Sequence, residues 1–254
     1  MRRLSCLLLM TLVVPVMADT VSLRADPWYP YNGQPDALQP GYMIEIARQI
    51  FAEQGLALDY RLLNWERSLA GVREGTIDCV VGAYKSDAPD LLFPEHSFGL
   101  DTIGFFAAGA ASDWRYEDMR SLYNKRIGVI ASYSYGSEID RFVADNADSH
   151  WVHTARGNQP LQRNIQMLLA GRLDLLIESV VVMQATLAAM GLSGSVHEVD
   201  RLDAADPLYI ACSPAVAAGA DYIRILDEGM RRLRESGELE RILSRYGLSD
   251  WQTR

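Results

Sequence analysis

A short pattern of glycine, aspartate and apolar residues occurs twice in this chain of 254 residues. Residues 75–81 read Gly-Thr-Ile-Asp-Cys-Val-Val, and residues 171–177 read Gly-Arg-Leu-Asp-Leu-Leu-Ile, each behind a stretch with the apolar spacing of a helix. Glycine suits the left-handed position that ends a helix, and an unbroken apolar run suits a strand covered on both faces in a parallel sheet. Each copy therefore predicts the helix-to-strand step of a βαβ unit, and two distant copies indicate two α/β halves.

Strand and helix patterns alternate around both copies. Residues 21–83 predict the order strand, helix, strand, helix, strand, and a similar alternation runs over residues 126–190. Two helices with charged outer faces are expected at 220–234 and 238–246. These patterns predict one α/β domain inserted within another.

Two short crossings would join the halves, the first near residues 102–108 and the second after residues 196–199. We therefore expect lobe I to comprise residues 19–103 and 204–254, and lobe II to comprise residues 104–203.

The residues directly after the two apolar runs are candidates for ligand contact, because ligands of open α/β sheets lie beyond the carboxyl ends of the strands. Glu178 has no neighbour in sequence to pair with it, so it would bind an ammonium group or, if desolvated, donate a proton. A salt bridge near the crossing is the structural alternative for Glu178, and an exposed surface position is the alternative for Lys85. The candidates at these positions are Gly82, Ala83, Tyr84, Lys85, Glu178 and Ser179.

A second group of candidates, Tyr133, Ser134 and Tyr135, lies in the link 132–136 between a strand and a helix start. Backbone N–H groups and the Ser134 hydroxyl there suit an anion or a carbonyl oxygen. Plain capping of the helix by Ser134 is the alternative.

The first 18 residues have the layout of a secretory signal. Arg2 and Arg3 precede the apolar run 4–16, and small residues end it at Ala18. We expect cleavage after Ala18 and export of the mature chain, the alternative being a buried N-terminal helix; the family resemblance described below implies the periplasm as its location. The formal net charge of −9 would become −11 without the two arginines, which argues against nucleic acid or anionic lipid as a partner.

Cysteine and histidine usage predicts neither a metal site nor a cofactor. Cys79 and Cys212 both fall in apolar runs, where a free buried thiol is the commoner state. A disulfide between them is the alternative, since both would be exported. His150 and His153 lie in a stretch without strand or helix pattern and have no partner at metal-ligand spacing, so we expect both at the surface of a loop.

Several short motifs follow one another along the chain in a fixed order. They are Asp26-Pro27-x-Tyr29-Pro30, Gly41-Tyr42 with Glu45-Ile46-Ala47, Trp65 with Gly75-x-x-Asp78, Gly171-Arg172-Leu173-Asp174, Leu208-Tyr209-Ile210-Ala211, and Ser236-Gly237-Glu238-Leu239 through Tyr246-Gly247. In these motifs the chain resembles the family 3 extracellular solute-binding proteins, the periplasmic receptors for polar amino acids and related solutes. The resemblance runs from about Val21 to Trp251 and implies the type II periplasmic-binding-protein fold: two α/β lobes, each a mostly parallel sheet flanked by helices, joined by a two-strand hinge.

The resemblance also implies site residues, with two departures. Tyr29 matches the family's stacking aromatic, and Trp65 and Arg67 open the helix before the first copy. The family's Thr or Ser and its carboxylate-binding Arg fall on Tyr84 and Pro89, and its ammonium-binding Asp falls on Ser179. Both ends of the usual α-amino-acid clamp are therefore missing, and Arg67 is a candidate replacement for the lost arginine, with an exposed first-turn arginine as the alternative.

We therefore expect a monomeric receptor that captures a small polar solute between two lobes for an ABC-type permease complex. The alternatives are a sensor that transports nothing and an enzyme like the cyclohexadienyl dehydratases of the same family. In the enzyme, Glu178 would be the general acid, although the missing arginine counts against a substrate with carboxylates.

Overall fold

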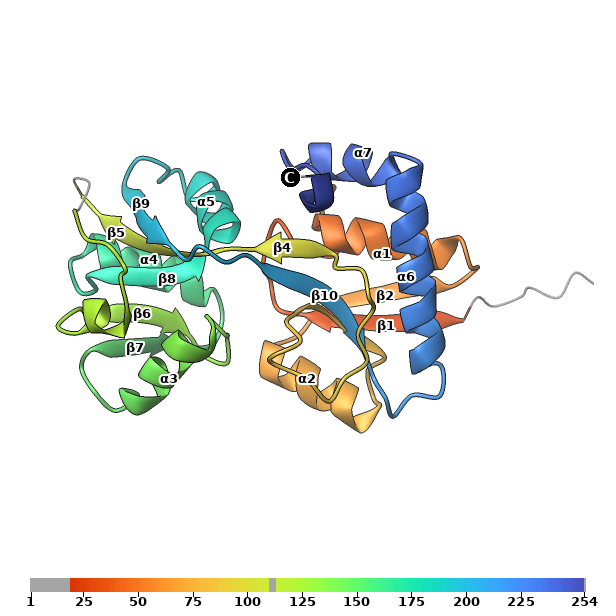
Figure 1. Cartoon of the computed structure of the whole chain (residues 1–254), viewed down its shortest axis with the longest axis horizontal. Helices are drawn as coiled ribbons and strands as arrows, with labels where there is room; N and C mark the ends of the chain where they lie inside the picture. The colour runs from red at the N-terminus through yellow and green to blue at the C-terminus, as the bar shows by residue number, and fades with distance from the viewer. Residues whose placement is uncertain (1–18, 110–112, 254) are drawn as a thin grey trace, which may run out of the picture.

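Two five-stranded sheets, each flanked by helices, form the two lobes of the chain (Figure 1). The computed structural model describes residues 19–109 and 113–253. The predicted signal peptide, residues 1–18, lies outside the described residues. The two-lobe α/β fold expected from the sequence is confirmed.

Lobe I has the strand order β2-β1-β3-β10-β4. Strands β1, β2 and β3 are parallel, whereas β10 is antiparallel to both of its neighbours. Its strands are β1 (Thr20–Ala25), β2 (Ala57–Leu62), β3 (Cys79–Ala83), β4 (Gly99–Asp101) and β10 (Asp206–Cys212). Its helices are α1 (Tyr42–Ala52), α2 (Trp65–Glu74), α6 (Gly219–Glu235) and α7 (Glu238–Ser244), with a short 3-10 helix at Trp251–Thr253. Helix α2 lies across the sheet from α1 (Figure 1).

Lobe II repeats this order as β7-β6-β8-β5-β9. Strands β6, β7 and β8 are parallel, and β5 is antiparallel to its neighbours β8 and β9. Its strands are β5 (Ile103–Ala108), β6 (Ile127–Ile130), β7 (Val152–Ala155), β8 (Leu175–Ser179) and β9 (Val196–Arg201). Its helices are α3 (Ser137–Asp145), α4 (Pro160–Leu169) and α5 (Val180–Ala189), with a short 3-10 helix at Met119–Leu122. In each sheet four of the five strands thus run in the same direction, as expected for a mostly parallel sheet.

The repeated pattern has the same structural role in both lobes. Gly75 and Gly171 adopt the left-handed conformation, with φ of 75° and 67°. Asp78 directly precedes β3. Its carboxylate accepts hydrogen bonds from the backbone N–H of Ser22 at 2.7 Å and from the hydroxyl group of Ser22 at 2.6 Å. Asp174 accepts in the same way from the Arg126 backbone N–H at 2.8 Å. Each aspartate therefore fixes the start of one inner strand to the start of its neighbour, at the edge of the sheet away from the carboxyl ends.

The two lobes are connected by two segments that lie side by side (Figure 1). Thr102 alone separates β4 from β5, and residues 202–205 connect β9 to β10. Strands β4 and β10 are paired, and the Leu202 backbone N–H donates to the Ile103 carbonyl at 2.9 Å. A paired two-strand connection of this kind permits rotation of one lobe against the other.

Strand β7 was not predicted, because its sequence Val-His-Thr-Ala has only two buried residues, Val152 and Ala155, and so lacks an apolar run. His153 therefore lies in a strand and not in a loop. The side chains of His150 and His153 are both exposed, as expected.

Cys79 and Cys212 form a disulfide, which corrects the expectation of free thiols. Both residues are fully buried, and the register of β3 and β10 places them directly opposite each other. Register between segments 133 residues apart is set by the whole fold, so the apolar runs alone could not reveal it.

We predict that reduction of this disulfide lowers the free energy of unfolding by about 2–5 kcal/mol, because the bond closes a loop that contains all of lobe II. Denaturant unfolding with and without reductant measures the difference. The double variant Cys79→Ala, Cys212→Ala is the control and should not respond to reductant. Equal stabilities of the oxidised protein and of a reduced protein verified by mass would contradict the prediction.

Candidate ligand-binding site

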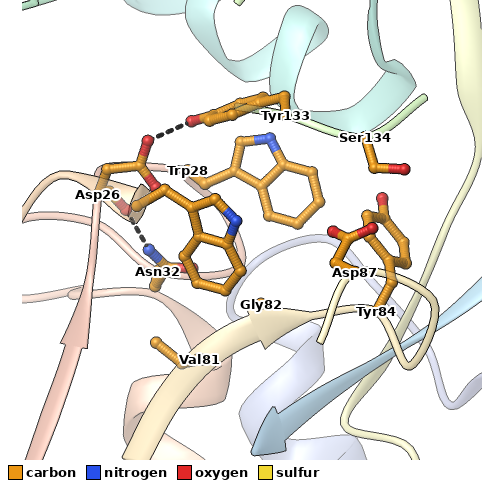
Figure 2. Close-up of a pocket in the computed structure, with 10 residues that line it drawn as sticks. Asp26, Trp28, Asn32, Val81, Gly82, Tyr84, Asp87, Tyr133 and Ser134 are labelled. Atoms are coloured by element: carbon orange, nitrogen blue, oxygen red, sulfur yellow. Dashed lines mark hydrogen bonds between the residues drawn. The ribbon is translucent and has the colours of Figure 1, made fainter. Parts of the chain in front are cut away.

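A small cavity lies between the lobes, where the carboxyl ends of β1, β3 and β6 meet (Figure 2). Its volume is about 30 Å³, room for one or two water molecules, so the lobes are closed on each other. The residues that line it are Asp26, Trp28, Asn32, Trp65, Val81, Gly82, Tyr84, Asp87, Tyr133 and Ser134.

Trp28 is the central side chain of the site. Its ring lies 4.5 Å from that of Tyr31 and meets the rings of Tyr84 and Tyr133 edge to face, each at 6.4 Å between centroids. Tyr133 belongs to lobe II, so the aromatic cluster spans both lobes. Such edge-to-face contacts stabilise buried aromatic groups beyond the burial of their area.

A tight turn after β1 fixes the position of Trp28. Trp28 and Asn32 exchange backbone hydrogen bonds of 2.8 and 3.2 Å, and the Asn32 amide donates to the Asp26 carbonyl at 2.6 Å (Figure 2). Gly41 packs against this turn with φ of 108°, and a Cβ there would lie 2.4 Å from the Asn32 Cα. The close approach requires glycine at position 41.

Hydrogen bonds join the lobes directly at the site. The Tyr133 hydroxyl donates to Asp26 Oδ2 at 2.6 Å, as Figure 2 shows, and Trp28 Nε1 donates to Glu178 Oε1 at 3.2 Å. Both donors are neutral and both acceptors are carboxyl groups. Closure of the lobes therefore removes two carboxyl groups from water while giving each one neutral donor from the other lobe.

Glu178, at the carboxyl end of β8, is 1% exposed. Its Oε1 also accepts from the Ser179 backbone N–H at 2.8 Å, whereas its Oε2 has no hydrogen-bond partner among the described residues. Burial raises the pKa of Glu178 to about 8, and the charges of Asp101 and Asp26 act in the same direction. The carboxyl group is therefore mostly protonated at neutral pH with the lobes closed.

Asp101, at the end of β4, is 2% exposed and accepts hydrogen bonds from three hydroxyl groups. Tyr31 donates at 2.9 Å and Tyr84 at 2.6 Å, both from lobe I, while Ser179 donates from lobe II. Burial is the main cause that raises the pKa of Asp101, and these three bonds oppose it. Asp101 thus contacts side chains of both lobes and also directly precedes Thr102, where the chain passes from lobe I to lobe II.

Two more carboxyl groups line the cavity itself. Burial raises the pKa of Asp26 and that of Asp87 to about 6 each, and the Tyr133 hydrogen bond lowers the pKa of Asp26. No arginine, lysine or histidine is among the ten lining residues. The site is therefore acidic as well as aromatic.

Five of the eleven site residues predicted from the sequence line the cavity: Trp65, Gly82, Tyr84, Tyr133 and Ser134. Glu178 does not line the cavity itself, but it accepts a hydrogen bond from the lining residue Trp28. Ala83 and Tyr135 are buried beside the site, and the Tyr135 hydroxyl accepts from the Ile130 backbone N–H at 2.8 Å.

The remaining three predicted residues lie elsewhere. Tyr29 is 38% exposed, with its hydroxyl on Gln39 and its ring beside Tyr246. Lys85 lies over the Tyr209 ring at 4.5 Å, and Arg67 is exposed in the first turn of α2. Sequence reasoning chose Tyr29 on family pattern, but the turn after β1 places its neighbour Trp28 at the cavity.

The helix start that was expected to bind an anion, that of α3, already binds a carboxylate of the chain itself. Asp140 of α3 accepts from the Tyr135 backbone N–H at 2.8 Å and from the Ser134 hydroxyl at 2.6 Å. An acid in the first turn suits the positive end of the helix dipole. This position is therefore occupied by the chain's own carboxylate.

Asp26, Asp87 and Asp101 were not predicted as site residues. Asp26 could have been found from its position, because it directly follows β1 (Thr20–Ala25), whereas Asp101 ends the three-residue strand β4 (Gly99–Asp101), which gives no sequence pattern. Among residues 19–109 and 113–253, no cluster of three histidine, cysteine or acidic side chains is arranged to hold a metal ion. Within the same residues, no helix is long and apolar enough to cross a membrane.

No protein-family model matches the sequence, and no curated protein matches it significantly. Solved structures do match. One comes from work on glutathione import through GshT and the cystine ABC importer TcyBC of Streptococcus mutans, with a TM-score of 0.75, 17% identity, and coverage of 94% of this chain and 100% of that one. A histidine kinase sensor domain with similarity to periplasmic binding proteins gives a TM-score of 0.72, 18% identity and coverage of 92% and 98%.

An ancestral arginine-binding protein bound to arginine gives a TM-score of 0.72, 16% identity and coverage of 90% of this chain and 98% of that one. In all three comparisons both lobes are covered. The chain thus has the two-lobe α/β fold of periplasmic amino-acid-binding proteins.

Proposed function

We propose that the protein is a solute-binding receptor that captures a small polar solute between its two lobes. The observation that carries the proposal is the cavity itself: polar side chains at the strand ends of both lobes meet there, and two hydrogen bonds made by lining residues join the lobes. The lobes are joined by two short segments, so they can separate to admit a solute and close over it. Because the cavity of about 30 Å³ holds only one or two water molecules, the lobes must close less far around a bound solute than they do in this structure. Closure then follows from the contacts that the solute makes with both lobes at once.

We further propose that residues 1–18 direct export to the periplasm and that the closed monomer delivers its solute to an ABC-type permease complex, or signals to a sensor. The solved structures of the same fold include one from work on import through a cystine ABC importer and one of a histidine kinase sensor domain. The net charge of −9 supports neither nucleic acid nor anionic lipid as a partner.

An enzyme related to the cyclohexadienyl dehydratases is the second candidate, and one observation favours it. Glu178 holds its proton at neutral pH, as a general acid must. A prephenate-like substrate carries carboxylates, however, and the ten lining residues include no cationic side chain to hold them. Turnover of prephenate or arogenate by the purified protein would support the enzyme, and its absence together with solute binding would support the receptor.

We predict that a cognate solute raises the melting temperature and that the variant Trp28→Ala weakens its binding by at least tenfold. The stabilisation should reach about 2.7 kcal/mol at a hundredfold excess of solute over Kd. Loss of Trp28 removes the ring that contacts aromatic groups of both lobes. Thermal shift with a panel of amino acids, amines, organic acids and sugars measures this, with calorimetry for affinities.

The control variant is Tyr29→Ala, the adjacent aromatic residue that lies outside the cavity. It should bind the solute as the wild type does. If no class of solute stabilises the protein, the receptor proposal is wrong.

We predict that raising the pH from about 5 to about 8.5 opens the lobes in the absence of solute. The pKa of Glu178 is about 8 with the lobes closed, against an ordinary value of 4.5 that returns when water reaches the carboxyl group. The closed form therefore binds this proton more tightly, and the closed form loses stability relative to the open form as the pH rises from 4.5 to about 8. Asp26 and Asp87, with pKa values of about 6, add to the effect at lower pH.

Small-angle X-ray scattering across this range measures the change as an increase in the radius of gyration. In the variant Glu178→Gln the part of the increase above about pH 6.5 should disappear, because the amide does not titrate. A radius that stays constant, or one that decreases with rising pH, would show that these carboxyl groups do not control closure.

A further inference from the structure

We infer that the solute is an organic cation without a carboxylate, an amine or guanidine whose charged group is held among Asp26, Asp87 and Glu178 against aromatic rings. The inference rests on the proposed receptor function and specifies the class of solute. It follows from four features of the cavity and its surroundings: the signs of the charges, the unpartnered acceptors, the aromatic rings and the occupied helix start.

The buried acids of the site differ from the other buried acid of the molecule. Three acidic side chains are buried in the described part of the chain: Asp101, Glu178 and Asp250. Asp250 has the Arg234 guanidinium at 2.6 Å. Asp101 and Glu178 receive their hydrogen bonds from hydroxyl, indole and backbone N–H groups, all of them neutral. A buried carboxylate without a cation is costly, so a cation brought by the solute would supply the missing charge.

Two buried oxygen atoms of the site lack donors. Glu178 Oε2 and Asn32 Oδ1 have no hydrogen-bond partner within the described residues. Asn32 lines the cavity, and its Oδ1 would lie 3.4 Å from a Cβ built on Gly82, another lining residue. Both atoms are acceptors once Glu178 is ionised, so the solute they suit is a donor of several N–H bonds. An ammonium or guanidinium group is such a donor.

Aromatic faces complete the site for a cation. Trp28, Trp65, Tyr84 and Tyr133 all line the cavity. A cation within about 6 Å of such a ring is attracted by the negative face of the ring's quadrupole. An anion gains nothing comparable from the same faces.

The cavity offers few free hydrogen-bond donors to a carboxylate group on the solute. The helix start of α3, which would suit it, is occupied by Asp140. The hydroxyl groups of Tyr84 and Tyr133 already donate to Asp101 and Asp26. A solute carboxylate would therefore face like charges with few donors. An α-amino acid is disfavoured for this reason, even though the fold is that of amino-acid receptors.

Pairs of compounds that differ by one carboxylate test the inference on the mature protein. Agmatine is compared with L-arginine, and cadaverine with L-lysine, by calorimetry at neutral pH. We expect the decarboxylated member of at least one pair to bind at least about tenfold more tightly, a difference of about 1.4 kcal/mol. Binding should release protons, visible as a dependence of the heat on the ionisation enthalpy of the buffer, and affinity should rise up to about tenfold per unit between pH 6 and 8.

Variants locate the binding on these carboxyl groups. Asp26→Asn and Glu178→Gln should each weaken amine binding at least about tenfold, since each removes one negative charge beside the cation. Asp36→Asn and Glu66→Gln are matched controls at exposed positions and should bind as the wild type does. Circular dichroism and melting temperature verify that each variant is folded. Should a site variant not fold, proton release by the wild type still decides the question.

The results separate this inference from the receptor proposal. If an amino acid binds as tightly as its decarboxylated partner, or if anionic or neutral solutes alone bind, the inference is overturned and the receptor function stands. If no solute of any class binds, both are overturned. Tighter amine binding with proton release supports both.

Discussion

Burial of carboxyl groups between two lobes is the constraint on which the site depends. Asp26, Asp101 and Glu178 are enclosed where the lobes meet, and the side chains that donate hydrogen bonds to them are all neutral: Tyr133 for Asp26, two tyrosines and Ser179 for Asp101, and Trp28 for Glu178. A carboxyl group in such surroundings either keeps its proton or requires a cation nearby. The closed form is therefore sensitive to protons and to charge in a way that a cleft lined by neutral side chains would not be.

Asp101 connects this chemistry to the movement of the lobes. It lies one residue from Thr102, and its three donors come from both lobes. Rotation about the two connecting segments would separate Ser179 from Asp101 while leaving Tyr31 and Tyr84 in place, because those two residues belong to the same lobe as Asp101. Opening thus changes the hydrogen bonds of a buried acid at the point where the chain crosses. Closure and the protonation of the site are linked by geometry.

The sequence predicted the fold well because the fold depends on local patterns. Apolar runs, helical spacing and glycine at helix ends located the strands and helices that build both sheets, and the repeat of Gly-x-x-Asp indicated two lobes. Two strands were not predicted: β4 (Gly99–Asp101) is only three residues long, and β7 (Val152–Ala155) has too few buried residues to give a pattern. The Cys79–Cys212 disulfide depends on register between β3 and β10, which no local pattern contains.

The site was less predictable, since it depends on which side chains of adjacent residues turn toward the cavity. The strand-end rule selected Tyr84, which lines the cavity, and Glu178, which contacts the lining residue Trp28, because it is a rule about topology. It could not separate Trp28 from Tyr29, whose directions are set by a turn held in place by Gly41. Nor could it show that Asp140 occupies the helix start of α3.

Similarity to solved structures at 16–18% identity establishes the fold of the chain. The identity of the ligand depends instead on the side chains of the site. An acidic cleft also provides the differential affinity that a closing receptor needs. In an open cleft the carboxyl groups are hydrated and attract a cation weakly, whereas in the closed cleft the low dielectric strengthens the same attraction. A cationic solute of the kind proposed would therefore bind the closed form better than the open one and would shift the equilibrium toward it. An anionic solute would have the opposite effect, because closure would bring its charge and those of Asp26 and Glu178 out of water together.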